Sequence, residues 1–452
     1  MKIIIVGYGK VGYTLADQLS GENHDVVIID NNPSVLQKSQ ELLDVMIIQG
    51  NGASLETQKE ADVQHGDVLI AATAADEVNL LCCILARKLG CKSTIARVRN
   101  PEYYQQIQFL RAELGLSLSI NPEKATANEI YRLLKIPSFM HCETFARGRA
   151  ELAEFKISED SSLSGMSLEG FGSMVHLDIL VCGIERGDEF VIPNGGFTMQ
   201  AGDNITVAGS TRDLASLIKQ LDLPRTKIRN VIIIGGSRTA VYLAKELLHS
   251  HVNVKIIERD FYRCQELSGL LPEALIIHGE GPIEALLVEE GIKSTDAVIP
   301  LTDIDEENII ISMYAKYMGV KKVITKIDRI EYAIAFKDKG IDSIIFPSLL
   351  TAGEIVRYVR AMGNTSGSEM VSLHKIIDGK AEAMEFHINS SVKYLNEPIM
   401  NLKLKKDVLL CCIIRKGKIV IPRGNDVIME NDSVILVTNA DRPILDFNDI
   451  FL

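Results

Sequence analysis

The sequence predicts an α/β fold in which one module occurs twice along the chain. The apolar runs that end at Gly7 and Gly235 lie 228 residues apart (235 minus 7), and such a repeat fixes the architecture. In each copy, β-branched runs alternate with helical spacing of apolar residues, which indicates a doubly wound parallel sheet. Val191–Gly195 and Val420–Gly424 then match within short strand patterns. These patterns indicate that each sheet is followed by a small β-rich α+β subdomain.

Composition and charge restrict the class of protein. With 452 residues, of which 46% are hydrophobic and 24% charged, the chain has the composition of a globular protein. The net charge of −12 disfavours nonspecific binding to nucleic acid or to an anionic lipid surface. No CxxC motif occurs among the eight cysteines, so we expect reduced, mostly buried thiols. The first apolar run ends at Gly7 and predicts a strand, and no apolar run approaches the roughly 18–20 residues that span a bilayer. We therefore expect a cytoplasmic protein, with any membrane role exerted through a partner.

A glycine-rich loop follows the first strand pattern. Ile3–Val6 is a continuous β-branched run, as in a parallel strand buried on both faces, and Gly7-Tyr8-Gly9-Lys10-Val11-Gly12 comes next. Between a strand and a helix, a GxGxxG string predicts a Rossmann dinucleotide site. Gly7 permits the tight turn, Gly9 lets the backbone approach a pyrophosphate, and Gly12 lets the helix pack on the strand. The helix N-terminus then directs its N–H groups at the phosphates.

An acidic residue ends the second predicted strand, Asp25–Asp30. Asp30 lies 18 residues beyond Gly12 (30 minus 12), close to the separation of about 20 expected for the acid that binds the adenosine ribose. A 2′-phosphate would face this carboxylate, so the pattern favours an NAD-type over an NADP-type adenosine. The other interpretation is a Rossmann fold that binds nothing.

The rest of the first copy continues the alternation. Further strands are predicted at 45–48, 68–71, 94–98 and 117–120, with helices at 54–62, 79–89 and 123–135. In such a sheet the ligand lies at the carboxyl ends of the strands, where Gly50–Ala53, Thr73, Ala74 and Arg97 are expected. Arg97 is the cation in this set, and pairing with a phosphate and a surface ion pair are equally compatible with its position.

No catalytic arrangement is evident in the β-rich part at 150–221, where a helix is predicted at 214–221. His141, His176 and Asp178 are scattered, and no nucleophile, base and orienting group come together in the sequence. We therefore expect no enzyme activity and no metal site. Residues 221–225 are predicted to link the two copies.

The second copy has an altered glycine loop. It reads Gly235-Gly236-Ser237-Arg238-Thr239-Ala240, so serine and alanine stand where the first copy has its second and third glycines. Glu258 stands where Asp30 stands, while Thr302 and Lys326 match Thr73 and Arg97. Both a second nucleotide site and a structural pseudo-site are compatible with this pattern.

These residues together resemble a known family. The elements are GYGKVG, Asp30, Gly50–Ala53, Thr73 with Asp76–Asn79, Arg97 and Asn100–Tyr103, followed by a β-rich unit with Ile192-Pro193 and Gly202-Asp203. The combination resembles the regulator-of-potassium-conductance (RCK, or KTN) module, and the tandem form is similar to the TrkA family of the bacterial Trk potassium uptake system. The resemblance implies RCK N-type domains at 1–138 and 229–362 and C-type subdomains at 139–222 and 363–452.

The resemblance also implies function. It implies binding of NAD(H) or an adenine nucleotide (ATP or ADP), assembly into a homo-tetrameric gating ring, and docking beneath a Trk-type potassium-translocating membrane subunit at the inner face of the cell membrane. The nucleotide-binding residues it implies are Gly7, Tyr8, Gly9, Lys10, Val11, Gly12, Asp30, Thr73, Ala74 and Arg97, with Gly235, Gly236, Ser237, Arg238, Thr239 and Glu258 in the altered copy.

Two other functions are compatible with the sequence. An NAD-dependent oxidoreductase would need a catalytic domain that presents a substrate to the nicotinamide. In both halves, however, the residues that follow the Rossmann part are predicted to form the same small β unit. A sensor for another ion transporter, with the β-rich units binding a cyclic dinucleotide, also stays open.

Overall fold

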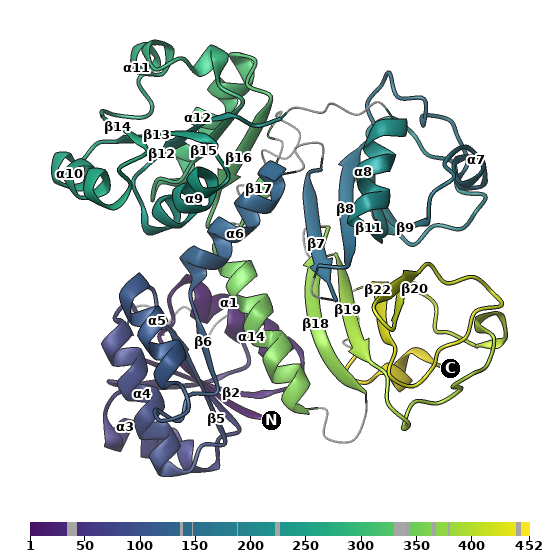
Figure 1. The fold of residues 1–452 in the computed structure, drawn as a ribbon. Helices are drawn as coiled ribbons and strands as arrows, with labels where there is room; N and C mark the ends of the chain where they lie inside the picture. Colours follow the sequence, from purple (N-terminus) through teal and green to yellow (C-terminus); the bar gives the residue numbers. More distant parts are fainter. Residues whose placement is uncertain are drawn as a thin grey trace. The chain divides into compact units, whose positions relative to one another are not determined.

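The computed structural model describes residues 1–33, 43–135, 139–146, 148–187, 189–221, 227–329, 341, 343–363, 368–377, 380–439 and 444–452 (Figure 1). They form two compact units, 1–131 with 230–359 and 132–229 with 360–452. The first unit thus contains both parallel sheets, and the second contains both antiparallel sheets. Like parts of the two copies therefore associate with each other. The predicted boundaries at 138 and 222 lie outside the described residues, and the four-domain division stays a prediction.

The first parallel sheet has the predicted Rossmann-like, doubly wound topology, with strand order β3-β2-β1-β4-β5-β6. Its central strands are continuous apolar runs, and Ile3, Ile4 and Ile5 are fully buried because helices cover both faces. The strands are β1 (Lys2–Val6), β2 (Asp25–Asp30), β3 (Met46–Gln49), β4 (Val68–Ala71), β5 (Ser93–Arg97) and β6 (Leu118–Ile120). The helices are α1 (Lys10–Gly21), α3 (Leu55–Glu60), η1 (Val63–His65), α4 (Asp76–Leu89), α5 (Pro101–Leu110) and α6 (Pro122–Lys135).

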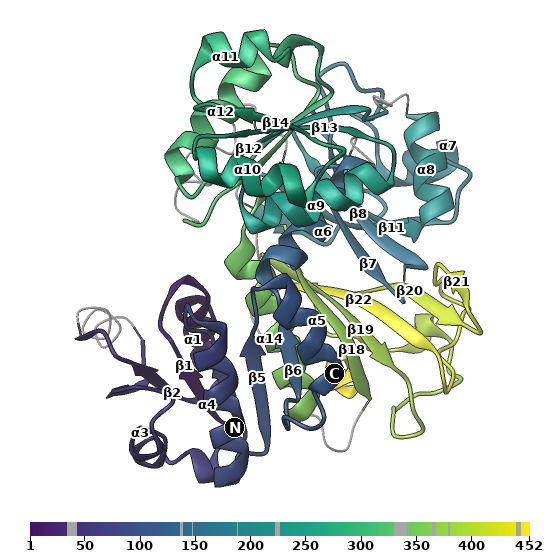
Figure 2. The same cartoon turned by 60° about the vertical axis from the view of Figure 1, so that its left-hand side comes forward.

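The second parallel sheet repeats this order as β14-β13-β12-β15-β16-β17, with all six strands labelled in Figure 1 and β12, β13 and β14 also labelled in Figure 2. Its strands are β12 (Asn230–Ile234), β13 (Asn253–Glu258), β14 (Leu275–His278), β15 (Ala297–Pro300), β16 (Lys322–Lys326) and β17 (Ser343–Ile345). The helical elements are α9 (Arg238–His249), α10 (Phe261–Leu270), α11 (Glu284–Glu289), η2 (Ile292–Ser294), α12 (Asp305–Tyr317) and α14 (Pro347–Gly363).

The two β-rich subdomains are five-stranded antiparallel sheets, ordered β10-β9-β11-β8-β7 and β18-β19-β22-β20-β21. The first contains β7 (His141–Phe145), β8 (Ala150–Lys156), α7 (Leu168–Met174), β9 (Ile179–Arg186), β10 (Glu189–Val191), β11 (Asn204–Ser210) and α8 (Thr211–Gln220). The second contains β18 (Glu369–Ile376), β19 (Ala381–His387), η3 (Ile399–Asn401), β20 (Val408–Arg415), β21 (Lys418–Val420), β22 (Ser433–Asn439) and η4 (Phe447–Ile450). The fold class predicted from the sequence is confirmed.

Several predicted element ends are wrong by one to three residues. Helix α4 begins at Asp76 rather than residue 79, with Asp76 and Glu77 in its first turn, where the helix dipole favours acidic side chains. Helix α8 begins at Thr211 rather than 214, because the Ser210 hydroxyl caps it by accepting a hydrogen bond from the Asp213 backbone N–H at 3.0 Å. Residues 222–225 of the predicted linker lie outside the described residues.

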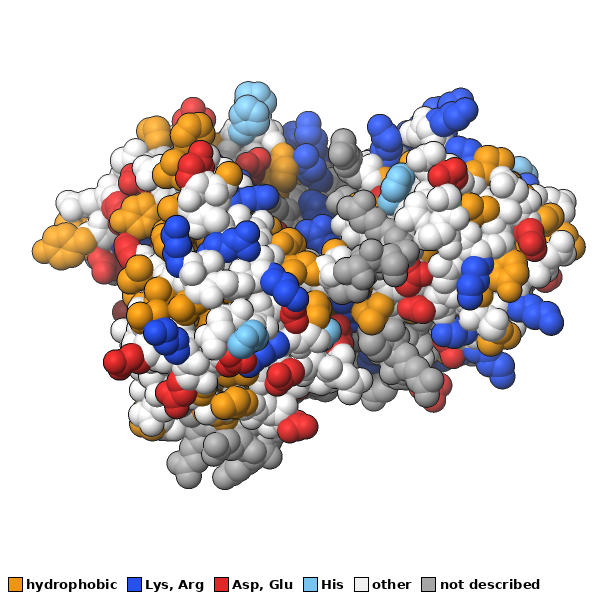
Figure 3. All heavy atoms as spheres, turned by 90° about the horizontal axis from the view of Figure 1, so that it is seen from below, with side chains coloured by type: hydrophobic (Ala, Val, Ile, Leu, Met, Phe, Trp, Pro, Cys, Tyr) orange, Lys and Arg blue, Asp and Glu red, His pale blue; other side chains and the backbone are white. Residues whose placement is uncertain are grey.

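Two surface properties bear on function. Within the described ranges, no helix is both long and apolar enough to cross a membrane. On the face shown in Figure 3, acidic and basic side chains are interspersed.

Candidate nucleotide site

The loop after β1 makes a tight turn into α1 that only glycine accommodates at two positions. Gly7 has a φ of +95°, and a side chain there would come within 2.9 Å of the Thr73 backbone nitrogen. Gly12 is equally constrained, because a Cβ would lie 2.0 Å from the Gly7 carbonyl oxygen. These two glycines let the loop, α1 and the end of β4 pack closely, as the sequence predicted.

Gly9 has a different role, since it is the N-cap of α1. A Cβ at Gly9 would meet no protein atom within 4 Å, and glycine offers no side chain to bind the first N–H groups of the helix. The helix N-terminus is therefore exposed to open space, and backbone donors at such an end favour an anion. The residues present fit the pyrophosphate of a dinucleotide or the phosphates of an adenine nucleotide.

Asp30 lies at the carboxyl end of β2, beside this loop. Its Oδ2 accepts a hydrogen bond from the Tyr8 backbone N–H at 2.7 Å, and its Oδ1 accepts one from the Asn32 N–H at 2.9 Å. These two hydrogen bonds orient the carboxyl group at the edge of the sheet. Each carboxylate oxygen can accept a further hydrogen bond, so ribose hydroxyls have acceptors at this position.

Thr73 and Arg97 meet at the ends of β4 and β5. Arg97 Nη2 donates to the Thr73 carbonyl oxygen at 2.6 Å, and burial lowers the pKa of the Arg97 guanidinium. Its Nε is buried and has no hydrogen-bond partner among the described residues. A buried donor without a partner fits an anionic ligand.

The repeated acidic and amide residues after Thr73 have a structural role that the sequence analysis did not recognise. Asn79 accepts from both Thr73 N and Oγ1, and its amide donates to the carbonyls of Thr73 and Arg97. Asp76 accepts from the backbone N–H groups of Arg99 and Asn100. The signal for this role in the sequence is the position of Asp76 and Asn79 in the first turn of a helix, because polar side chains there can bind the backbone of a neighbouring loop.

The second copy retains the acid and the threonine, but its own side chains bind the backbone groups of its glycine loop. Glu258 accepts from the N–H groups of Gly236 and Asp260 at 2.6 and 2.8 Å, as Asp30 does in copy one. However, the Ser237 hydroxyl accepts from the Ala240 N–H at 3.3 Å, so the chain caps α9 with its own side chain. Arg263 Nε also donates to the Gly236 carbonyl at 2.8 Å.

The remaining candidate groups do not form a second chemical site. The described residues contain no cluster of three or more His, Cys, Asp or Glu side chains suited to a metal, and the His141 side chain lies outside the described residues. The eight cysteines are buried, and burial raises the pKa of Cys82 to about 12.

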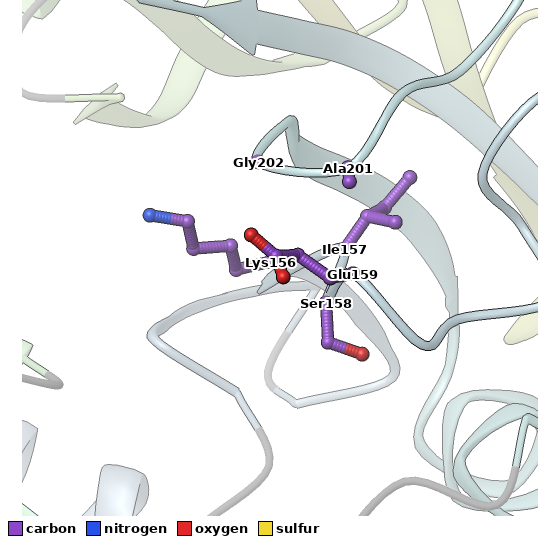
Figure 4. A pocket seen from close by; sticks show the side chains of 6 residues that line it. All are labelled: Lys156, Ile157, Ser158, Glu159, Ala201 and Gly202. Atoms are coloured by element: carbon purple, nitrogen blue, oxygen red, sulfur yellow. The ribbon is translucent and has the colours of Figure 1, made fainter.

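Two surface hollows lie away from the glycine loop. One, of about 500 Å³, is lined by Gln105, Gln106, Phe109 and Leu110 on α5. The other, of about 400 Å³, lies in the first β-rich subdomain between 156–159 and 201–202 (Figure 4). In this view Lys156 points away from the Ala201–Gly202 loop.

The family matches decide the identification. The TrkA-N domain matches residues 3–122 and 231–347, and the TrkA-C domain matches residues 152–237 and 383–451. The chain belongs to the TrkA family. A TrkA homologue from Methanosarcina mazei, named Trk system potassium uptake protein TrkA homolog 1, is 35% identical over 97% of this chain and 98% of its own length. The Trk system potassium uptake protein TrkA of Haemophilus influenzae is 30% identical over 100% of this chain and 98% of its own.

Solved structures agree with the fold of a TrkA family member. The GsuK RCK domain has a TM-score of 0.64 at 16% identity and covers 97% of this chain and 92% of its own. The GsuK channel bound to NAD has the same TM-score and identity, covering 97% of this chain and 77% of its own. GsuK has also been solved bound to ADP, with a TM-score of 0.52 at 14% identity, covering 79% of this chain and 69% of its own.

Proposed function

We propose that this TrkA family chain is a nucleotide-responsive regulatory subunit that gates a Trk-type potassium-translocating membrane protein. The observation that carries the proposal is the uncapped N-terminus of α1 at Gly9, beside the oriented carboxylate of Asp30. The fold is shared with GsuK structures bound to NAD and to ADP, so NAD(H) or ATP/ADP is the proposed ligand.

Four groups of the first copy would bind the nucleotide. The backbone of Gly7–Gly12 would hold the phosphates, Asp30 would accept from the ribose hydroxyls, and the orphaned Nε of Arg97 would bind a further anionic oxygen, with Thr73 and Ala74 at the same edge. Adenine nucleotides that differ in phosphate number and charge would therefore differ in affinity. The role we propose for this site is regulatory.

The ligand would act by changing the balance between conformations. A nucleotide biases gating only if its affinity differs between the open and closed states. A complete switch from 1:99 to 99:1 needs about 5.5 kcal/mol of such difference, which several sites in a homo-tetrameric ring would share. Repeated modules suit closed symmetric assembly. The net charge of −12 suits docking at the inner face of the cell membrane, since cytoplasmic loops of membrane proteins carry excess Lys and Arg.

The test is potassium flux in liposomes that contain the membrane subunit. The protein is added from outside with ATP, ADP, NAD+ or NADH in turn, and flux should change with both the protein and the nucleotide. Gly9→Ala should abolish the nucleotide dependence while leaving docking intact. Flux that is indifferent to the protein under every nucleotide, together with no co-purification with the membrane subunit, would exclude gating.

A further inference from the structure

The strand registers define which residues of the two β-rich subdomains are equivalent. Residues 210 and 439 end β11 and β22, and the ladders pair them with residues 150 and 381 respectively. The same ladders continue to β7 and β18, which pair with β8 and β19. The equivalent pairs that follow are Ala150 with Ala381, Phe145 with Ile376, Glu143 with His374, Arg149 with Lys380, and, from β9 and β20, Cys182 with Cys411.

Glu143 and His374 touch each other although they occupy equivalent positions. His374 Nδ1 lies 2.7 Å from Glu143 Oε2, and the Glu143 side chain is only 4% exposed. Arg132 Nη2 also lies 3.3 Å from Glu143 Oε2 within the first copy. The His374 ring packs edge-on against Phe145, with ring centroids 4.9 Å apart. The contact is therefore partly desolvated, and hydrogen bonds to charged groups contribute more there than in water.

Contact between equivalent residues places both on a pseudo-two-fold axis. In a two-fold interface, residue i of one partner touches residue j of the other and the reverse, so a residue that touches its own equivalent lies on the axis. The equivalent residues Cys182 and Cys411 are also both buried in one apolar cluster at this interface. The apolar cluster around them contains equivalent residues from both copies, including Phe145, Ile376, Ala150 and Ala381.

We propose that the Glu143–His374 pair selects the partner of each β-rich subdomain, so that the first copy pairs with the second copy and not with another first copy. If two first copies paired, residue 143 of each would face the other on the axis. The buried carboxylate would then lose an N–H donor at 2.7 Å and gain a second acceptor in its place. Removing one donor from a buried carboxylate is unfavourable, and a like charge opposite it adds repulsion. The partner that this surface fits is therefore a second-copy subdomain of this same chain sequence.

The off-axis ion pair does not make this selection. Lys380 Nζ lies 2.8 Å from Glu185 Oε1 across the interface. Arg149 is the equivalent of Lys380, so two first copies would still bring a cation to Glu185. The residues that distinguish a pair of unlike copies from a pair of like copies are therefore the two on the axis. There the repeat has diverged, so that one copy carries an acid and the other a histidine. Specificity here comes from disfavouring the wrong partner as well as from stabilising the right one.

The test uses full-length chains with the axis residues exchanged. Glu143→His places histidine at both axis positions, and His374→Glu places an acid at both. The double variant Glu143→His with His374→Glu restores unlike residues in reverse order. His176→Glu is the matched control, because it makes the same change at an exposed histidine in the same unit. Urea unfolding midpoints should fall most for His374→Glu and recover in the double variant, with the control unchanged.

Mixing then separates partner choice from simple loss of stability. The Glu143→His and His374→Glu chains, one carrying a mass tag, are co-refolded from urea at equal concentration and counted by native mass spectrometry. Mixed assemblies should exceed the binomial proportion, because only unlike chains restore an acid opposite a histidine. The mixture should also unfold at a higher urea concentration than either variant alone. Binomial mixing with no rise in the midpoint would overturn the proposal, as would a double variant no more stable than His374→Glu.

Discussion

Lys10 Nζ and Asp328 Oδ2 lie 2.7 Å apart and join the two copies at the glycine loop. Lys10 begins α1 directly after Gly9, whereas Asp328 follows β16 of the second copy. Asp328 Oδ2 also lies 3.4 Å from Lys326 Nζ, the residue equivalent to Arg97. A phosphate bound at the N-terminus of α1 would therefore lie beside a contact between the two parallel-sheet domains.

The first prediction concerns acid sensitivity of this contact. Burial alone would raise the pKa of Asp328, but Lys326 and Lys10 outweigh it and hold the pKa below its usual value. A lowered folded-state pKa means that the contribution is present above the unfolded value of about 3.9 and is lost as the pH falls through the lower folded value. Asp328→Asn should therefore reduce the free energy of unfolding by at most about 1 kcal/mol at pH 7, since the Lys10 side chain is 61% exposed.

The measurement is urea unfolding of the wild type and Asp328→Asn between pH 7 and pH 3. The difference should shrink towards the acid end. Asp67→Asn is the control for a lysine pair within one copy, because Asp67 binds Lys92 at 2.7 Å. A difference between Asp328→Asn and the wild type that stays constant with pH would contradict the assignment.

The second prediction separates binding from folding at the glycine loop. Gly9→Ala adds a methyl group where no protein atom lies within 4 Å, so the fold should persist, but the methyl would occupy the approach of a phosphate. Asp30→Ala should weaken adenine nucleotide binding by about 1–3 kcal/mol, because the ribose hydroxyls lose their acceptor. Calorimetry measures both. Gly21→Ala, at the other end of α1 with equally open space, should bind as the wild type does, and wild-type affinity in both loop variants would rule the site out.

A third prediction concerns the inequality of the two copies. Because Ser237 caps α9 with its own hydroxyl, each chain should show one tight adenine nucleotide site, with the second weaker or absent. Ser237→Gly should raise affinity at the second copy while lowering stability by only a few tenths of a kcal/mol. Titration stoichiometry by calorimetry is the readout, and Ser210→Gly at the cap of α8 is the control. Two equal, independent sites in the wild type would refute this prediction.

The sequence predicts the parallel sheets well because their strands are unbroken apolar runs that are buried on both faces. Gly7, Gly9 and Gly12 could be assigned separate roles because the turn, the phosphate approach and the helix packing impose different steric demands. The start of α8 could not be found from apolar periodicity, since the first turn of that helix is polar and is fixed by the Ser210 cap.

Contacts between the copies were beyond the sequence for a different reason. A repeat shows that Glu143 and His374 occupy equivalent positions only once the strand registers are known, and it does not show that they touch. The Lys10–Asp328 contact spans 318 residues, and no local pattern encodes a pairing at such a separation. The orphaned Nε of Arg97 likewise depends on how tightly β4 and β5 enclose its side chain.

The fourth prediction is that the thiols are unreactive in the folded protein. Burial raises the pKa of Cys82 and of Cys142 to about 12, which leaves about one thiolate in ten thousand at pH 8. The disulfide reagent dithionitrobenzoate should therefore release little thionitrobenzoate from the native chain and eight equivalents after denaturation in urea. Rapid release of one or more equivalents from the native protein would identify a reactive cysteine and reopen thiol chemistry.

The last prediction is that bound NADH is not consumed. Hydride transfer to a substrate requires a proton donor and a substrate pocket facing the nicotinamide. In the described residues, the carboxylates of Asp30 and Glu258 accept backbone hydrogen bonds beside the glycine loops. Within the described ranges, no group of three or more His, Cys, Asp or Glu side chains could hold a metal ion. Absorbance at the NADH band should therefore stay constant when the protein is incubated with NADH and a panel of aldehydes, ketones and 2-oxo acids. Oxidation that depends on one of these substrates and disappears in Gly9→Ala would instead show that the chain is an oxidoreductase, because the loss in that variant would tie turnover to the same loop.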